Sequence, residues 1–164
     1  MKFSLSVDYA IRILLYLHRS EERIQTGTTI ATAVGTSYPY VLKLTLLLKD
    51  GGFMDTVQGR YGGYALRKPV NQINLYDVYL AINGELKMSP CCENRGNPHA
   101  NRAKEQCMIY EFFHDIQENI IAQMESVTIA DLAAKMEGDM KKKRTYSGKN
   151  TLVNPEHSQV KIIY

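Results

Sequence analysis

The chain has 164 residues, of which 45% are hydrophobic and 23% charged, and it contains no Trp. This composition suits one compact domain, or a small domain with an extension, and excludes a chain that is fibrous or disordered throughout. The net charge of +3 hides an asymmetry: residues 1–70 carry nine basic and five acidic residues, residues 71–140 five and eleven, and residues 141–164 six and one. We therefore expect a basic head that meets a polyanion, an acidic body and a basic, solvated tail.

Hydropathy and cysteine content indicate the cellular compartment in which the protein is expected. No apolar run approaches the roughly 20 residues that a membrane-spanning helix needs. The first residues lead into an amphipathic segment that contains Asp8 and Arg12, unlike the apolar core of a signal peptide. Three cysteines, an odd number, disfavour a secreted disulfide framework and favour reduced thiols or metal ligands. We expect a soluble cytoplasmic protein with no membrane partner.

Two helices are predicted near the start of the chain. Apolar residues recur every three or four positions over 7–19, which predicts a half-buried helix with Ser6 as its N-cap. After a polar loop, Thr28 and its neighbour open a short helix over 30–34, which Gly35 ends.

A third helix and a hairpin follow. Ser37 is the expected N-cap of this helix, Pro39 lies in its first turn, and the helix ends at Gly51. Two helices joined by a tight glycine-containing turn are typical of a helix-turn-helix. Residues 53–67 then predict a short β-hairpin whose tip, 58–63, is rich in glycine and basic, as expected of a wing.

The second half of the chain is predicted to contain helices on either side of one polar loop. We expect a helix over 73–82, a cysteine-bearing loop over 89–106, and helical periodicity over 107–127. This last helix is too long to be buried against so small a body alone, so we expect it to pack across a dimer. Thr128 caps a short helix over 129–136.

These elements together predict an α+β, mostly α, fold: a winged helix-turn-helix with a long C-terminal dimerisation helix. We divide the chain into a winged-helix DNA-binding domain (1–83), a cysteine-bearing sensor loop (84–106), a dimerisation helix with a short following helix (107–137), and a flexible basic tail (138–164).

The helix that starts near Ser37 has the residues that DNA binding requires. The major groove admits one helix, and its phosphate walls favour donors and cations near the N-terminus of that helix. The basic wing adds a second contact, to the minor groove or the backbone. The alternative is an ordinary helical hairpin in which Arg60 is a solvated loop charge. The expected DNA-binding residues are Thr28, Ser37, Tyr38, Tyr40, Lys43, Gln58, Arg60 and Tyr61.

The polar loop concentrates metal-binding groups. Cys91, Cys92, His99 and Cys107 supply three thiols and an imidazole, and thiolates suit zinc or iron–sulfur clusters. The spacing is not C-x2-C, which disfavours a zinc knuckle, and the adjacent cysteines supply one ligand between them. His99 and Asp8 are candidates for further ligands. The alternative for His99 is a solvated imidazole, and the alternative for Asp8 is an exposed carboxylate at the start of a helix. A cluster-free thiol switch with Cys107 needs no fourth ligand.

Four segments resemble one known family: 7–12 (VDYAIR), 37–42 (SYPYVL), 59–66 (GRYGGYAL) and 73–78 (INLYDV). They are similar to the Rrf family of winged-helix transcriptional regulators, and the resemblance covers about residues 1–136. It implies a homodimeric transcription regulator, usually a repressor, that binds double-stranded DNA. Several members hold a [2Fe-2S] or [4Fe-4S] cluster through three cysteines in the loop before the dimer helix.

The resemblance also assigns residues. Cys107 matches the third family cysteine, Cys91 or Cys92 matches the first, and the middle cysteine is missing. Tyr110 occupies the position of a histidine ligand in one branch, whereas Asp8 stands where the nitric-oxide-sensing branch has an aspartate ligand. Gln58 matches the wing arginine of some members, and Arg60 lies two residues further along the chain.

The predicted function is a homodimeric regulator of a palindromic operator, whose affinity is set by an iron–sulfur cluster or by the redox state of the cysteines in 89–107. A cluster-free thiol or small-effector regulator of the same fold is the alternative. A metal- or thiol-dependent enzyme, or a protein-interaction module, is the alternative of a different class. The sequence has no His or Asp next to a cysteine, no phosphate loop and no plausible pair of carboxylates, so we predict that it is not an enzyme.

Overall fold

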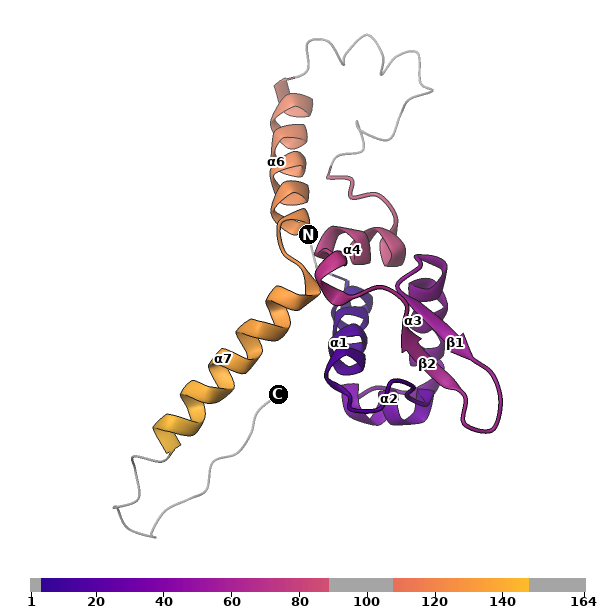
Figure 1. Cartoon of the computed structure of the whole chain (residues 1–164). Coiled ribbons are helices and arrows are strands. Elements are labelled where there is room, and N and C mark those ends of the chain that lie inside the picture. Colours follow the sequence, from indigo (N-terminus) through magenta and orange to yellow (C-terminus); the bar gives the residue numbers. More distant parts are fainter. Residues whose placement is uncertain (1–3, 89–107, 148–164) are drawn as a thin grey trace, which may run out of the picture. The chain divides into compact units, whose positions relative to one another are not determined.

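The structure is a computed structural model that describes residues 4–88 and 108–147 (Figure 1). The chain forms two compact units, Met1–Leu132 and Ala133–Tyr164. The first unit contains every element that bears on the predicted DNA interface. Its helices and its two-stranded antiparallel sheet confirm the predicted mostly helical α+β class.

Helix α1, Leu5–Arg19, supplies much of the core. Ser4 caps it, because the Ser4 side chain accepts a hydrogen bond from the backbone N–H of Ser6 at 3.2 Å. The prediction that Ser6 is the N-cap was wrong, since the helix begins two residues earlier and Ser6 lies inside its first turn. One face of the helix is buried, through Val7, Ala10, Ile13, Leu14, Leu15 and Leu17.

Helix α2, Gly27–Val34, and helix α3, Tyr38–Asp50, form the predicted helix-turn-helix. Gly35 ends α2 in the left-handed region at φ 72°, a conformation that glycine adopts without strain. Thr26 is the N-cap of α2, which therefore begins three residues before the expected start at Ile30. The apolar faces of the two helices meet in the core through Ile30, Val34, Val41, Leu44 and Leu48.

Strands β1, Met54–Val57, and β2, Gly63–Leu66, form the wing. Met54 lies opposite Leu66 and Val57 opposite Gly63. A single bridge from Gln25 extends this sheet: its N–H donates to the Tyr64 carbonyl at 3.0 Å, and Tyr64 N–H donates back at 2.8 Å. The segment before α2 is therefore hydrogen-bonded to the base of the wing.

The chain then forms a short 3-10 turn, Val70–Gln72, followed by α4, Leu75–Asn83, and α6, Met108–Glu125. Helix α6 lies against α4 (Figure 1). The turn after α6 is fixed to the segment before α4, because Leu75 N–H donates to Val127 at 3.0 Å and Ile129 N–H donates to Ile73 at 2.9 Å. The base of α6 is thus hydrogen-bonded to the winged-helix body.

Helix α7, Ile129–Ser147, is longer than predicted. Thr128 caps it as expected, with its hydroxyl accepting from the Asp131 N–H at 3.2 Å. The expected end at Met136 was wrong, because the residues that follow favour helix and Gly138 alone costs about 1 kcal/mol relative to Ala. No helix in the described ranges is long and apolar enough to cross a membrane.

Candidate nucleic-acid interface

Helix α2 and the tip of the wing lie at the same end of the first unit, opposite α4 (Figure 1). Thr28 is exposed in the first turn of α2, where its hydroxyl lies 2.9 Å from that of Thr26. The first N–H groups of a helix lack partners within the helix and favour anions. This end of the unit therefore offers hydrogen-bond donors and hydroxyl groups to a polyanion.

The first turn of α3 is open to solvent. Ser37 occupies the N-cap position with extended backbone, but its side chain makes no capping hydrogen bond, contrary to our prediction. Its exposed hydroxyl therefore remains accessible to a ligand. Tyr38 is 45% exposed at the start of the helix, and Lys43 is exposed one turn further along.

Tyr40 is half-buried and contacts α1. Its hydroxyl lies 2.9 Å from that of Ser6, and its ring packs edge-on against Tyr9 with centroids 5.6 Å apart. We expected Tyr40 to contact DNA, but the structure places it where it holds α3 against α1. Tyr40 thereby fixes the direction in which the first turn of α3 points.

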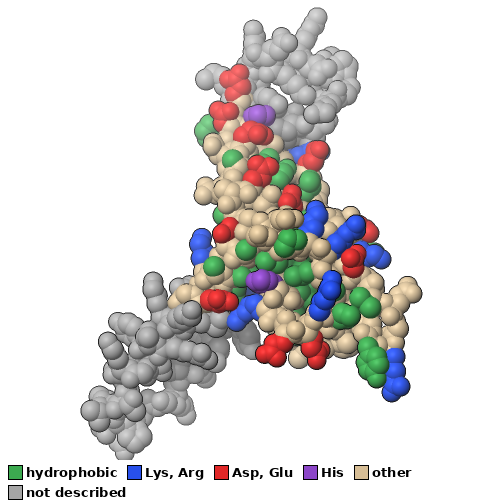
Figure 2. All heavy atoms as spheres, viewed as in Figure 1, with side chains coloured by type: hydrophobic (Ala, Val, Ile, Leu, Met, Phe, Trp, Pro, Cys, Tyr) green, Lys and Arg blue, Asp and Glu red, His purple; other side chains and the backbone are tan. Residues whose placement is uncertain are grey.

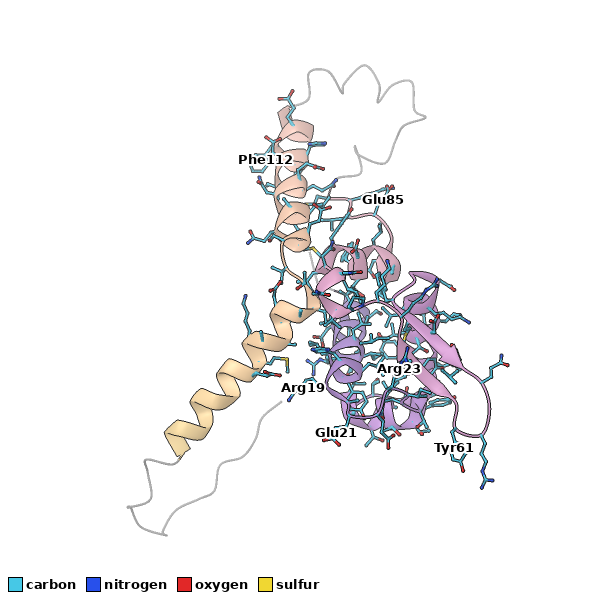
Figure 3. The ribbon with its side chains drawn as sticks, in the orientation of Figure 1. Arg19, Glu21, Arg23, Tyr61, Glu85 and Phe112 are labelled. Carbon is cyan, nitrogen blue, oxygen red and sulfur yellow. The ribbon has the colours of Figure 1, made fainter. Side chains whose placement is uncertain are left out.

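The wing presents one cation and one aromatic ring at its tip. Gln58 and Arg60 are exposed, and Tyr61 is 83% exposed and points away from the body (Figure 3). The Arg60 guanidinium lies 5.8 Å from the centre of the Tyr61 ring, within the range of a cation–π contact. At exposed sites such a contact is worth about 0.5–1 kcal/mol, so it favours this orientation of Arg60.

A glycine lets α2, α3 and the wing approach one another closely. A Cβ atom on Gly27 would lie 2.5 Å from the Tyr38 ring and 3.3 Å from the Tyr64 ring. Gly27 was not among the predicted site residues, and neither was Gln25, which is 8% exposed and bridges to Tyr64. The available signal was a glycine directly after Thr26, a good N-cap residue, at the start of a helix.

Asp8 is the one predicted metal ligand among the described residues. Its carboxylate accepts a hydrogen bond from Arg12 at 2.9 Å, and both side chains are about half exposed. The Arg12 guanidinium also lies 5.9 Å from the centre of the Tyr9 ring. The remaining predicted ligands, Cys91, Cys92, His99 and Cys107, lie outside the described residues. Within 4–88 and 108–147, no three His, Cys, Asp or Glu side chains form a group that could hold a metal ion.

The acidic residues that the sequence carries in its second half include several on α6. Acidic side chains gather along α6 in Figure 2. Burial raises the pKa of the half-buried Tyr76 phenol on α4, and the carboxylates of Glu85, Glu125 and Glu118 raise it further. The negative potential around α4 and α6 disfavours an approach of phosphates at that end of the unit.

Comparisons with known proteins agree with this geometry. HTH-type transcriptional regulator NsrR of Halalkalibacterium halodurans is 26% identical over 133 residues, which cover 80% of this chain and 90% of that protein. The fold is similar to that of CymR, the global cysteine regulator of B. subtilis, with a TM-score of 0.62, 22% identity and coverage of 82% of this chain and 98% of that one. It is also similar to that of T. potens IscR, with a TM-score of 0.67, 22% identity and coverage of 85% and 90%.

A family model described as Rrf2, iron-dependent transcriptional regulator, matches residues 3–135. This match spans α1 to the first turns of α7 and so includes the helix-turn-helix, the wing and α6. The chain therefore belongs to the Rrf2 family, and it is a DNA-binding transcriptional regulator, not an enzyme.

Proposed function

We propose that the protein acts in the cytoplasm as a homodimeric repressor that binds a palindromic operator through α3 and the wing. The observation that carries this proposal is the open first turn of α3, where Tyr38 is exposed and the Ser37 side chain makes no capping hydrogen bond. This turn lies at the same end of the unit as the tip of the wing, the segment that contains Arg60 (Figure 1). In this proposal α3 enters the major groove and Arg60 reaches the adjacent minor groove or the phosphates.

The dimer is proposed to form along α6. Phe112 is 63% exposed on this helix, with its ring centre 5.7 Å from that of Phe113. Large exposed aromatic rings are typical of surfaces that a partner covers. A two-fold axis along α6 places two copies of α3 on successive major grooves, which accounts for a palindromic operator.

Control of DNA binding is proposed to lie in residues 89–107. An iron–sulfur cluster would be held by Cys107 and by Cys91 or Cys92, with Asp8 or His99 as further candidate ligands. Such a cluster supplies a site that changes on oxidation or on cluster loss. Asp8 suits this role because its ion pair with Arg12 is half exposed and worth no more than about 1 kcal/mol. A stronger bond from the Asp8 carboxylate to a metal would replace this ion pair.

The path from this segment to DNA is also proposed. The segment immediately precedes α6, and Met88, just before it, donates its N–H to Gln117 of α6 at 3.1 Å. Ordering of 89–107 on ligation would set the angle of α6, whose base is hydrogen-bonded to the winged-helix body. The angle of α6 would determine whether the spacing of the two α3 helices in the dimer equals the spacing of successive major grooves. Ligation in 89–107 would in this way change the affinity for DNA.

One experiment tests the DNA-binding part of this proposal. Selection by the full-length protein from a random pool of duplexes is expected to enrich sequences with two-fold symmetry and half-sites one or two helical turns apart. Sedimentation of the same preparation is expected to give a dimer without DNA. Enrichment of an asymmetric sequence by a monomer would contradict the proposal.

A second experiment separates a cluster from bare thiols. Protein purified without oxygen is expected to be brown and to contain iron and acid-labile sulfide, and Cys107→Ser is expected to lose both. A colourless wild-type protein without iron would contradict the cluster. If its DNA affinity then changes on thiol oxidation, the alternative of a cluster-free thiol switch between Cys107 and Cys91 or Cys92 replaces it.

Gly27→Ala tests the contact between α2 and α3. The added methyl group displaces the Tyr38 ring, whereas Ala is itself favourable at the first position of a helix. We expect DNA affinity to fall about fivefold, the value of one lost polar contact, with the melting temperature nearly unchanged. Gly138→Ala, at a glycine with no atom within 4 Å of the added Cβ, is the matched control. Equal affinities of the two variants would contradict a role of Tyr38 in binding.

A further inference from the structure

The exposed face of α3 carries an apolar stripe. Leu42 is 48% exposed and Leu46 is 58% exposed, and both follow Tyr38 at spacings of four residues. Residues four apart are neighbours on a helix surface, so these side chains form one continuous strip. Isolated exposed leucines are ordinary, whereas neighbouring exposed leucines form a contiguous apolar surface that a ligand can cover.

The same helix lacks the side chains that read bases by paired hydrogen bonds. Arg reads guanine and Asn or Gln reads adenine in this way, and α3 contains no Arg, Asn or Gln. Its hydroxyl groups are largely engaged: Thr45 is 1% exposed and donates to the Leu42 carbonyl at 3.0 Å, and Tyr40 is paired with Ser6. Lys43 and Tyr38 are the exposed polar side chains in its first two turns.

Among the groups that base edges present in the major groove, the thymine methyl group is the apolar one. We propose that Leu42 and Leu46 determine operator specificity by packing against thymine methyl groups, an inference that rests on the proposed entry of α3 into the major groove. Lys43, between the two leucines, supplies the cation for a phosphate or a guanine edge. Four helical residues span about 6 Å and base pairs are about 3.4 Å apart, so the two thymines lie about two base pairs apart.

The test removes methyl groups from the DNA and leucines from the protein. The probe is the duplex enriched by selection from a random pool, made once with thymine and once with uracil at the half-site thymines. Uracil lacks the methyl group and keeps every hydrogen-bonding group. We expect wild-type affinity to fall about fourfold for each buried methyl group that is removed.

The Leu42→Ala, Leu46→Ala double variant is expected to bind the thymine and uracil duplexes equally. Leu80→Ala is the matched control, because Leu80 is also exposed, at 42%, but lies on α4. The control is expected to keep the wild-type preference for thymine. Circular dichroism is expected to show that both variants fold, because the substituted side chains are exposed.

Three outcomes would overturn the inference: equal wild-type affinity for the two duplexes, full discrimination by the double variant, or a change in its oligomeric state without DNA. The last outcome would assign the stripe to protein–protein contact. If selection enriches no sequence, the proposed operator binding itself fails. If it enriches a symmetric sequence that uracil leaves unaffected, the proposed function stands and the thymine contact fails.

Discussion

Leu44→Ala is expected to lower the free energy of unfolding by about 2–5 kcal/mol, the usual cost of a large cavity in a core. Leu44 is fully buried on α3, where the apolar faces of α2 and α3 meet. Small domains are stable by only about 5–15 kcal/mol, so this variant loses a large share of its stability. Urea denaturation at equal protein concentration measures the change.

Leu42→Ala is the matched control for Leu44→Ala. Leu42 lies on the same helix, two residues away, but it is 48% exposed. Exposed substitutions of this kind usually change stability by less than about 0.5 kcal/mol. We therefore expect Leu44→Ala to lower the free energy of unfolding and Leu42→Ala to lower the affinity for DNA. Equal destabilisation by the two substitutions would contradict the orientation of α3 described above.

Gly63→Ala is expected to weaken both the fold and DNA binding. A Cβ atom on Gly63 would clash with the carbonyl oxygen of Gln25 and lie 2.8 Å from its carbonyl carbon. These are backbone atoms, so the wing itself must move. The two hydrogen bonds between Gln25 and Tyr64 are then strained or lost, at about 1 kcal/mol each. We expect about 2 kcal/mol of destabilisation, and at least tenfold weaker DNA binding as the wing leaves its position.

Thermal unfolding and duplex titration check this prediction, with Gly27→Ala for comparison. Both substitutions add one methyl group at the base of the DNA-binding surface. At Gly27 the group that must yield is the end of a tyrosine side chain, whereas at Gly63 it is the backbone. Gly27→Ala is therefore expected to lose affinity while keeping its stability. A Gly63→Ala protein with wild-type melting temperature and affinity would show that the bridge to Gln25 does not position the wing.

The sequence predicted the fold well because its elements are separated by strong local signals. Gly35 ends α2 where expected, the hairpin forms around residues 58–63, and α4 and α6 lie within a few residues of their predicted bounds. Helix ends were less predictable. Ser4 and Ser6 are equally plausible caps in the sequence, and only the path of the chain before α1 decides between them.

The site could be predicted in part. Thr28, Tyr38, Lys43, Arg60 and Tyr61 are exposed as a DNA contact requires. Tyr40 could not be assigned from spacing, because its direction depends on Ser6 and Tyr9, which are distant in sequence. The role of Gly27 was hidden for the same reason, since it arises where three elements approach one another. The division of the chain after residues 83, 106 and 137 stays a prediction.

We propose that this chain recognises a specific DNA sequence through α3 and the wing. The most direct test of this proposal is the ratio of two Kd values for the full-length protein at one salt concentration, for the selected duplex and for a shuffled duplex of the same composition. We expect the selected duplex to bind at least about 10³-fold more tightly than the shuffled duplex, and we expect Arg60→Ala to reduce this affinity. Equal Kd values for the two duplexes would contradict the proposal.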